Sequence, residues 1–109
     1  MLESLFGNIV AEKVLFFIQA YGDGYARKMS RVYDIPLNGI LQQLRRLENG
    51  GIIVGQDKGR TRLYTFNPRY PFLLELKTLL QKAMDLLPEE EIVKYYRLRT
   101  RPRRKGKPL

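Results

Sequence analysis

The segment from residue 25 to residue 66 constrains the fold of this chain most strongly. Its central part, residues 37–49, carries apolar side chains at three- and four-residue steps: Ile40, Leu44 and Leu47. This spacing predicts a helix with one buried face. Gly50 and Gly51 follow at once, and glycine favours the left-handed conformation that ends helices. The segment therefore predicts a helix that stops at residue 49 and continues directly into a strand.

Two strands are expected after this helix and a second helix before it. Residues 52–56 and 61–66 read as strands, joined by the basic turn Asp57-Lys-Gly-Arg60. The earlier helix spans residues 25–33, and Asp34-Ile-Pro36 forms the turn between the helices, because proline disfavours helix at the preceding residue. Two helices with a tight turn, followed by a basic hairpin, are typical of a winged helix-turn-helix. This layout predicts DNA binding.

Amphipathic helices are also expected on both sides of this segment. Residues 9–21 have helical apolar spacing after a predicted N-cap at Asn8, and residues 72–87 form a leucine-rich helical pattern. A shorter helix is expected from Pro88 to Tyr96. The two long helices carry more apolar side chains than so small a domain buries, although a leucine stripe is by default core. The surplus predicts a homodimer formed through the N-terminal helix and the 72–87 helix.

The expected fold class is mainly α with a small β-hairpin wing. Residues 5–69 form the predicted winged helix-turn-helix domain, 70–96 a C-terminal helical dimerisation segment, and 97–109 a disordered basic tail. The formal net charge is +9, but residues 94–109 hold eight of the 20 Lys and Arg and no acid. The preceding residues are nearly neutral, so a DNA-facing positive surface there requires local clustering.

The composition excludes several classes of function. The chain has no cysteine and no histidine, which excludes disulfides, thiolate zinc sites, cysteine nucleophiles and histidine acid-base chemistry. We therefore expect no cofactor, no metal and no catalytic activity. No apolar run approaches the roughly 18–20 residues that span a bilayer, and Met1-Leu-Glu-Ser4 lacks a basic signal region. These features favour a cytoplasmic protein that does not enter the membrane.

Candidate DNA contacts lie on three of the expected elements. On helix 37–49, the face opposite the apolar one carries Asn38, Gln42, Gln43 and Arg46, with Leu37, Gly39 and Leu41 nearby. Amide side chains can bond adenine, and arginine can bond guanine or phosphate. The hairpin offers three cations to the backbone or minor groove: Lys58, Arg60 and Arg62. The start of the second helix adds possible phosphate contacts: Tyr25, Arg27, Lys28 and Arg31.

Other interpretations of the same features remain open. Helix 37–49 can be an ordinary solvated face, and the hairpin charges can serve solubility alone. The tail, Arg97-Leu-Arg-Thr-Arg101 onward, can act as a DNA-contacting arm or as a nonspecific solubilising segment. Two alternative functions follow. One is an RNA- or ribosome-associated basic protein, and the other is a winged-helix adaptor that holds a protein partner.

The chain resembles the ArsR-like winged helix-turn-helix family, of the type often associated with nucleotidyltransferase-like proteins. The segments that carry the resemblance are Leu5-Phe-Gly-Asn8, Tyr25-Ala-Arg-Lys-Met-Ser-Arg31, Leu44-Arg-Arg-Leu-Glu-Asn-Gly-Gly-Ile-Ile53 and Tyr64-Thr-Phe-Asn-Pro68. The resemblance implies a dimeric DNA-binding transcriptional regulator. It implies recognition positions at Leu37, Asn38, Gly39, Gln42 and Gln43, and wing positions at Lys58, Arg60 and Arg62. Pro36 and Asp34 depart from the family pattern, where serine or threonine and glycine are usual.

Overall fold

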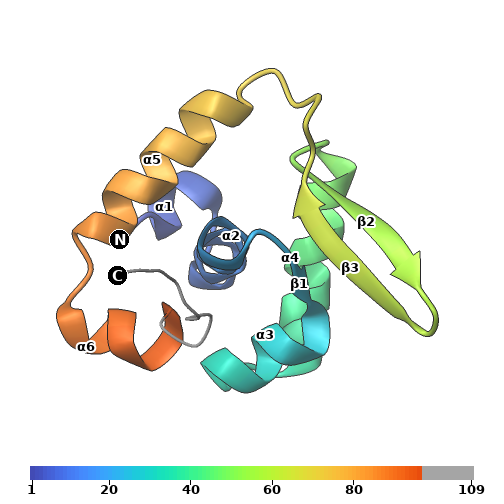
Figure 1. Ribbon diagram of the computed structural model, residues 1–109, viewed down its shortest axis with the longest axis horizontal. Coiled ribbons are helices and arrows are strands. Elements are labelled where there is room, and N and C mark those ends of the chain that lie inside the picture. The colour runs from blue at the N-terminus through green and yellow to red at the C-terminus, as the bar shows by residue number, and fades with distance from the viewer. Residues whose placement is uncertain (97–109) are drawn as a thin grey trace, which may run out of the picture.

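Helix α2 (Ile9–Tyr21) lies at the centre of the fold, and the other elements surround it (Figure 1). The computed structural model describes residues 1–96, and the predicted basic tail, 97–109, lies outside them. The Asn8 side chain caps α2 by accepting a hydrogen bond from the Ala11 N–H at 2.8 Å, as predicted. The helix ends at Gly22, whose φ of 87° suits glycine.

The protein is mainly helical with one small antiparallel sheet. The helices besides α2 are α1 (Glu3–Phe6), α3 (Ala26–Tyr33), α4 (Leu37–Asn49), α5 (Leu73–Asp85), α6 (Glu89–Glu91) and the π-helical turn η1 (Ile92–Tyr96). The strands are β1 (Gly24–Tyr25), β2 (Ile53–Lys58) and β3 (Thr61–Phe66), in the order β1-β3-β2. The central layout of two helices followed by a hairpin was predicted, whereas α1 and β1 were not.

The turn between α3 and α4 shows how the departures at Asp34 and Pro36 are accommodated. Asp34 adopts a left-handed φ of 55°, which is the conformation that glycine usually provides. Pro36 precedes the first residue of α4 and provides no side-chain cap. The Ser30 hydroxyl instead donates to the Ile35 carbonyl at 2.5 Å and closes the turn. The chain therefore makes the tight turn without the usual residues.

The apolar side chains of α2 are covered by the chain itself. Consecutive residues from Val14 to Ile18 are at most 3% exposed, and they share one core with Leu80 and Ala83 of α5 and with Tyr96 of η1. Ile9, at the first turn of this helix, is the apolar residue most exposed on it, at 41%. The expectation that one face of α2 is left for a partner copy is therefore wrong for most of its length. Residues 5–69 and 70–96 also share this single core.

A buried tyrosine pair ties α3 to η1 across α2. The Tyr33 hydroxyl donates to the Lys13 carbonyl at 2.8 Å and lies 3.0 Å from the Tyr96 hydroxyl. Burial raises the pKa of Tyr33 and of Tyr96 well above the usual value, so both hydroxyls remain neutral. The turn η1 is thus bonded to α3, the helix that precedes α4.

No helix within residues 1–96 has both the length and the apolar character needed to cross a membrane. Most of the exposed large apolar side chains lie on or directly beside α5 (Phe72, Leu74 and Leu86) or near the N-terminus (Met1, Leu5 and Ile9).

Gly24 is required for β1 to lie against the core. A Cβ at this buried position would lie 2.7 Å from Phe17 Cε1 and 2.7 Å from Met29 Cε. Because both neighbours are buried, we expect Gly24→Ala to lower the free energy of unfolding by about 1–3 kcal/mol in denaturant titrations. The control is Gly39→Ala, whose Cβ would lie 3.6 Å from Ile35 and which we expect to change stability by at most about 1 kcal/mol, towards greater stability. Equal stability of the two variants would contradict this packing.

Candidate nucleic-acid interface

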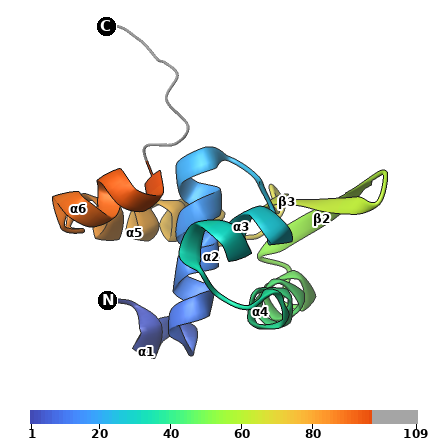
Figure 2. The same ribbon diagram turned by 90° about the horizontal axis from the view of Figure 1, so that it is seen from below.

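A groove of about 330 Å³ runs between α3, α4 and the β2–β3 hairpin. Four arginines from these three elements line it: Arg27, Arg45, Arg60 and Arg62. Leu37 and Leu41 of α4 and Tyr25 of β1 supply apolar surface. Figure 2 shows the hairpin extending beyond the helical body and α4 at one edge of the molecule. The fold thus gathers cations that are widely separated in sequence.

The outward face of α4 is polar. Because each residue of a helix turns by about 100°, the direction opposite the buried Ile40, Leu44 and Leu47 is shared by a single stripe of residues. Its exposed members are Asn38, Gln42, Arg45, Arg46 and Asn49. Arg45 and Asn49 were not among the predicted contacts, although the same rotation would have identified both from the sequence. Gly39 is half-buried at the far edge of this stripe.

Two of the predicted DNA contacts, Gln43 and Arg46, bond each other, and Arg46 also bonds α1. Arg46 Nε donates to Gln43 Oε1 at 2.9 Å, and Arg46 Nη2 donates to the Phe6 carbonyl at 2.5 Å. The guanidinium therefore lies beside the end of α1, away from the groove that Arg45 lines. These contacts reduce the donors that Arg46 can offer to a ligand.

The start of α3 adds a second cationic surface. A groove of about 550 Å³ is lined by the apolar Phe17 and Tyr21 and by three exposed cations, Arg27, Lys28 and Arg31. Tyr25, Arg27 and Thr61 line both this groove and the groove beside α4. The predicted contacts on α3 and two of those in the hairpin, Arg60 and Arg62, therefore border one continuous surface, whereas Lys58 lines neither groove.

The hairpin turn presents Lys58 and Arg60 to solvent. Gly59 has a φ of 64°, and the Thr61 hydroxyl closes the turn by donating to the Lys58 carbonyl at 2.8 Å. No ion pair within residues 1–96 involves Lys58 or Arg60. Their charges are therefore available to an anionic ligand, as the sequence predicts.

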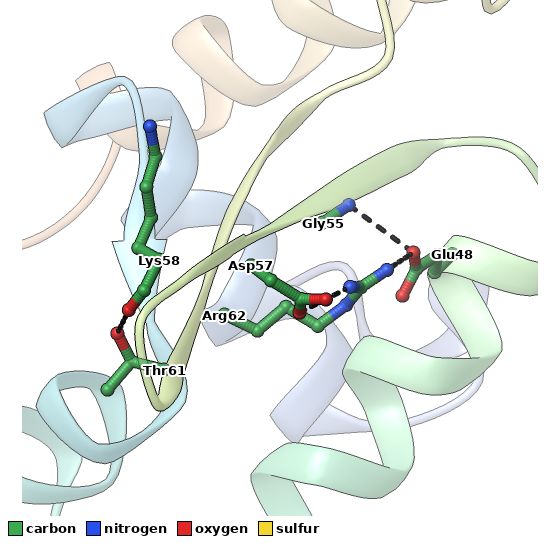
Figure 3. Close-up of polar contacts among 6 residues, drawn as sticks. All are labelled: Glu48, Gly55, Asp57, Lys58, Thr61 and Arg62. Carbon is green, nitrogen blue, oxygen red and sulfur yellow. Dashed lines mark hydrogen bonds and ion pairs between the residues drawn. The ribbon is translucent and has the colours of Figure 1, made fainter.

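Arg62 differs from its two neighbours, because two carboxylates of the same chain hold its guanidinium (Figure 3). Arg62 Nη2 donates to Glu48 Oε2 at 2.6 Å, and Nη1 donates to Asp57 Oδ1 at 2.9 Å. These hydrogen bonds, first with Glu48 and then with Asp57, raise the pKa of Arg62, so the guanidinium stays charged. Arg62 is a predicted wing contact, and these two carboxylates already compensate its charge in the protein alone.

This arrangement places cations of α3, α4 and the hairpin around one groove. The cations are exposed and spread over three elements, as expected of a surface that meets a phosphate backbone. Within residues 1–96, no group of three or more carboxylates lies close enough together to hold a metal ion. Comparison of the chain with family models, with curated proteins and with solved structures finds no match.

Proposed function

We propose that the protein binds double-stranded DNA as a winged helix-turn-helix transcriptional regulator. The observation that carries the proposal is the shared groove, in which arginines of α3, α4 and the hairpin line one surface beside the polar stripe of α4. A helix, a turn, a second helix and a basic hairpin follow one another in the order that this fold requires. The residue patterns shared with the ArsR-like family support the same proposal.

In the proposed complex, α4 enters the major groove with its polar stripe towards the base edges. Asn38 and Gln42 have amides that can bond adenine, and Arg45 can bond guanine. Lys58 and Arg60 lie along the backbone or in the minor groove, while Tyr25 and Arg27 contact phosphate. Gln43 and Arg46 support α4 from the side of α1, so we assign them no base contact. We propose that the protein binds DNA in the cytoplasm.

Gln42 tests the proposed reading face, and Gln43 is its matched control. Gln42 is exposed on the polar stripe, whereas Gln43 is half-buried and bonded to Arg46. Selection from random-sequence duplexes first provides a preferred site. We expect Gln42→Ala to reduce the preference for that site over mixed-sequence DNA by about five- to a hundredfold, as loss of a base contact does. Gln43→Ala should keep most of the preference.

Equal losses for Gln42→Ala on the selected and mixed duplexes would contradict the assignment of Gln42. Binding that prefers single-stranded or duplex RNA, and that disappears when residues 97–109 are deleted, would favour the RNA-associated alternative. Lack of any nucleic-acid affinity at low salt would favour the adaptor.

The hairpin turn should contribute affinity that does not depend on sequence. Lys58→Ala with Arg60→Ala removes two cations that have no ion-pair partner among the described residues. We expect the slope of log K against log salt to become shallower by about 1.8, since each lost phosphate contact changes it by about 0.9. The control, Arg69→Ala with Lys77→Ala, removes the same charge from exposed positions outside both grooves and away from the α5 residues Phe72, Leu79 and Leu86. An equal change in slope for both pairs would show that net charge alone determines binding.

We also propose that the protein acts as a homodimer through α5. Phe72 and Leu86, at the two ends of this helix, are 62% and 67% exposed, and Leu79 between them is half-buried. These three residues are seven positions apart, which places them on one side of the helix and suits packing against an identical helix. A two-fold dimer of this kind would present two copies of α4 about one DNA turn, roughly 34 Å, apart.

The α5 stripe can be tested with charge substitutions that spare the core. We expect Phe72→Glu with Leu86→Glu to convert the dimer to a monomer in analytical ultracentrifugation, because two charges would be buried in the seam. Leu74→Glu is the control, since Leu74 is 76% exposed on a different side of α5 and should leave the dimer intact. A dimer that survives the double substitution would show that α5 does not form the interface.

A further inference from the structure

Four residues link α4 to the hairpin, and together we call them the hairpin clasp: Glu48, Gly55, Asp57 and Arg62 (Figure 3). Glu48 Oε2 accepts hydrogen bonds from Arg62 at 2.6 Å and from the Gly55 N–H at 3.3 Å. Arg62 also bonds Asp57, which lies opposite it on β2. One carboxylate of α4 therefore contacts both strands of the hairpin.

The residue types at these positions suit the clasp rather than the elements that carry them. Glu48 lies in the last turn of α4, where the helix dipole disfavours a negative charge. Gly55 leaves the space that the guanidinium occupies, because a Cβ there would lie 2.4 Å from Arg62 Nε. Gly55 is in β2, an edge strand of the sheet, and its N–H finds an acceptor in Glu48. Helix and strand thus each hold a locally unfavourable residue that the clasp uses.

The clasp also places negative charge beside a cationic groove. Its two carboxylates and one guanidinium sum to a charge of −1, next to Arg27, Arg45 and Arg60. The Arg62 side chain is 39% exposed and that of Asp57 is 79% exposed, so water screens these pairs and they add little to stability. The effect of the clasp is therefore mainly on the position of the hairpin and on the local field.

We propose that Glu48 is a positioning and specificity-determining residue of the DNA surface. Through the clasp it holds the hairpin at a fixed place beside α4 and keeps Arg62 from bonding phosphate. Phosphate contacts strengthen binding to every sequence, whereas base contacts strengthen binding to one. Withholding a cation therefore lowers affinity for random DNA and increases discrimination. This inference rests on the proposed DNA-binding function.

Glu48→Gln is the main test, because it removes the charge and keeps the shape and an oxygen acceptor. Salt titrations use a mixed-sequence duplex and the selected duplex. We expect affinity for the mixed duplex to rise about five- to tenfold near physiological salt, with a salt slope steeper by about 0.9, as one added phosphate contact gives. Affinity for the selected duplex should rise less, so the ratio of the affinity for the selected duplex to that for the mixed duplex falls.

Two further variants separate the clasp from general charge effects. Glu90→Gln removes the same charge from an exposed position on α6, outside the proposed dimer seam, and should leave unchanged both the salt slope and the ratio of affinities for the selected and mixed duplexes. Asp57→Asn breaks the outer ion pair at a well-exposed site and should shift both quantities as Glu48→Gln does, by a smaller amount. If Glu48→Gln behaves like Glu90→Gln, or weakens binding to both duplexes equally, the specificity role is wrong.

Amide hydrogen exchange in the free protein tests the positioning role without DNA. We expect Glu48→Ala to speed exchange of the Gly55 N–H about fivefold, the change that loss of one hydrogen bond of ordinary net strength produces. Glu90→Ala should leave it unchanged. Unchanged exchange in Glu48→Ala would overturn the positioning role, whatever the DNA result. If the unaltered protein binds no duplex at low salt, the proposed function and the specificity role fall together, while the exchange result still decides whether the clasp positions the hairpin.

Discussion

The burial of α2 on all sides is the constraint on which the other elements depend. Five consecutive residues of this helix, Val14 to Ile18, are nearly inaccessible, and a helix with apolar residues around its whole circumference must be covered around its whole circumference. Each large apolar side chain so buried contributes roughly 1.5–3 kcal/mol. Helices α3, α4 and α5 and the turn η1 supply the cover. The buried face of α4 is fixed in this way, and with it the face that α4 turns outward.

Two contacts made by α4 with its other neighbours also set which polar residues remain available to a ligand. Arg46 lies beside α1 through its bonds to Gln43 and Phe6, and Arg62 is held by the hairpin clasp. Arg45 and Arg60 remain on the groove and form no ion pair within residues 1–96. Neighbouring arginines in the sequence thus have different environments, because each is directed by the element it packs against and not by its place in a basic cluster.

The sequence predicted the elements that have strong local signals. Helices 9–21 and 37–49 agree with α2 and α4 because glycines end both, and the Asp57-Lys-Gly-Arg60 turn placed the hairpin. Strand β1 was not predicted, since its two residues are too short to show periodicity and exist as a strand only through pairing with β3. Arg46 bonds Phe6 and Arg62 bonds Glu48 across 40 and 14 residues of sequence, so no local pattern reveals these two partners. DNA binding, dimerisation and the ArsR-like resemblance stay predictions.

Helix α2 lies between α4 and α5, and the shared core with its Tyr33–Tyr96 contact fixes both of them against it. Its thickness therefore sets how far apart these two helices lie. In the proposed dimer, α5 would meet its copy on one side of α2, while α4 packs on α2 from another side. The distance between the two copies of α4 would then include the thickness of α2 twice. Because packed side chains transmit changes in volume, the size of residues such as Phe16 or Leu15 would help to set the separation of the two half-sites that a dimer can occupy. Residues remote from any DNA contact would in this way determine the half-site spacing that the dimer prefers.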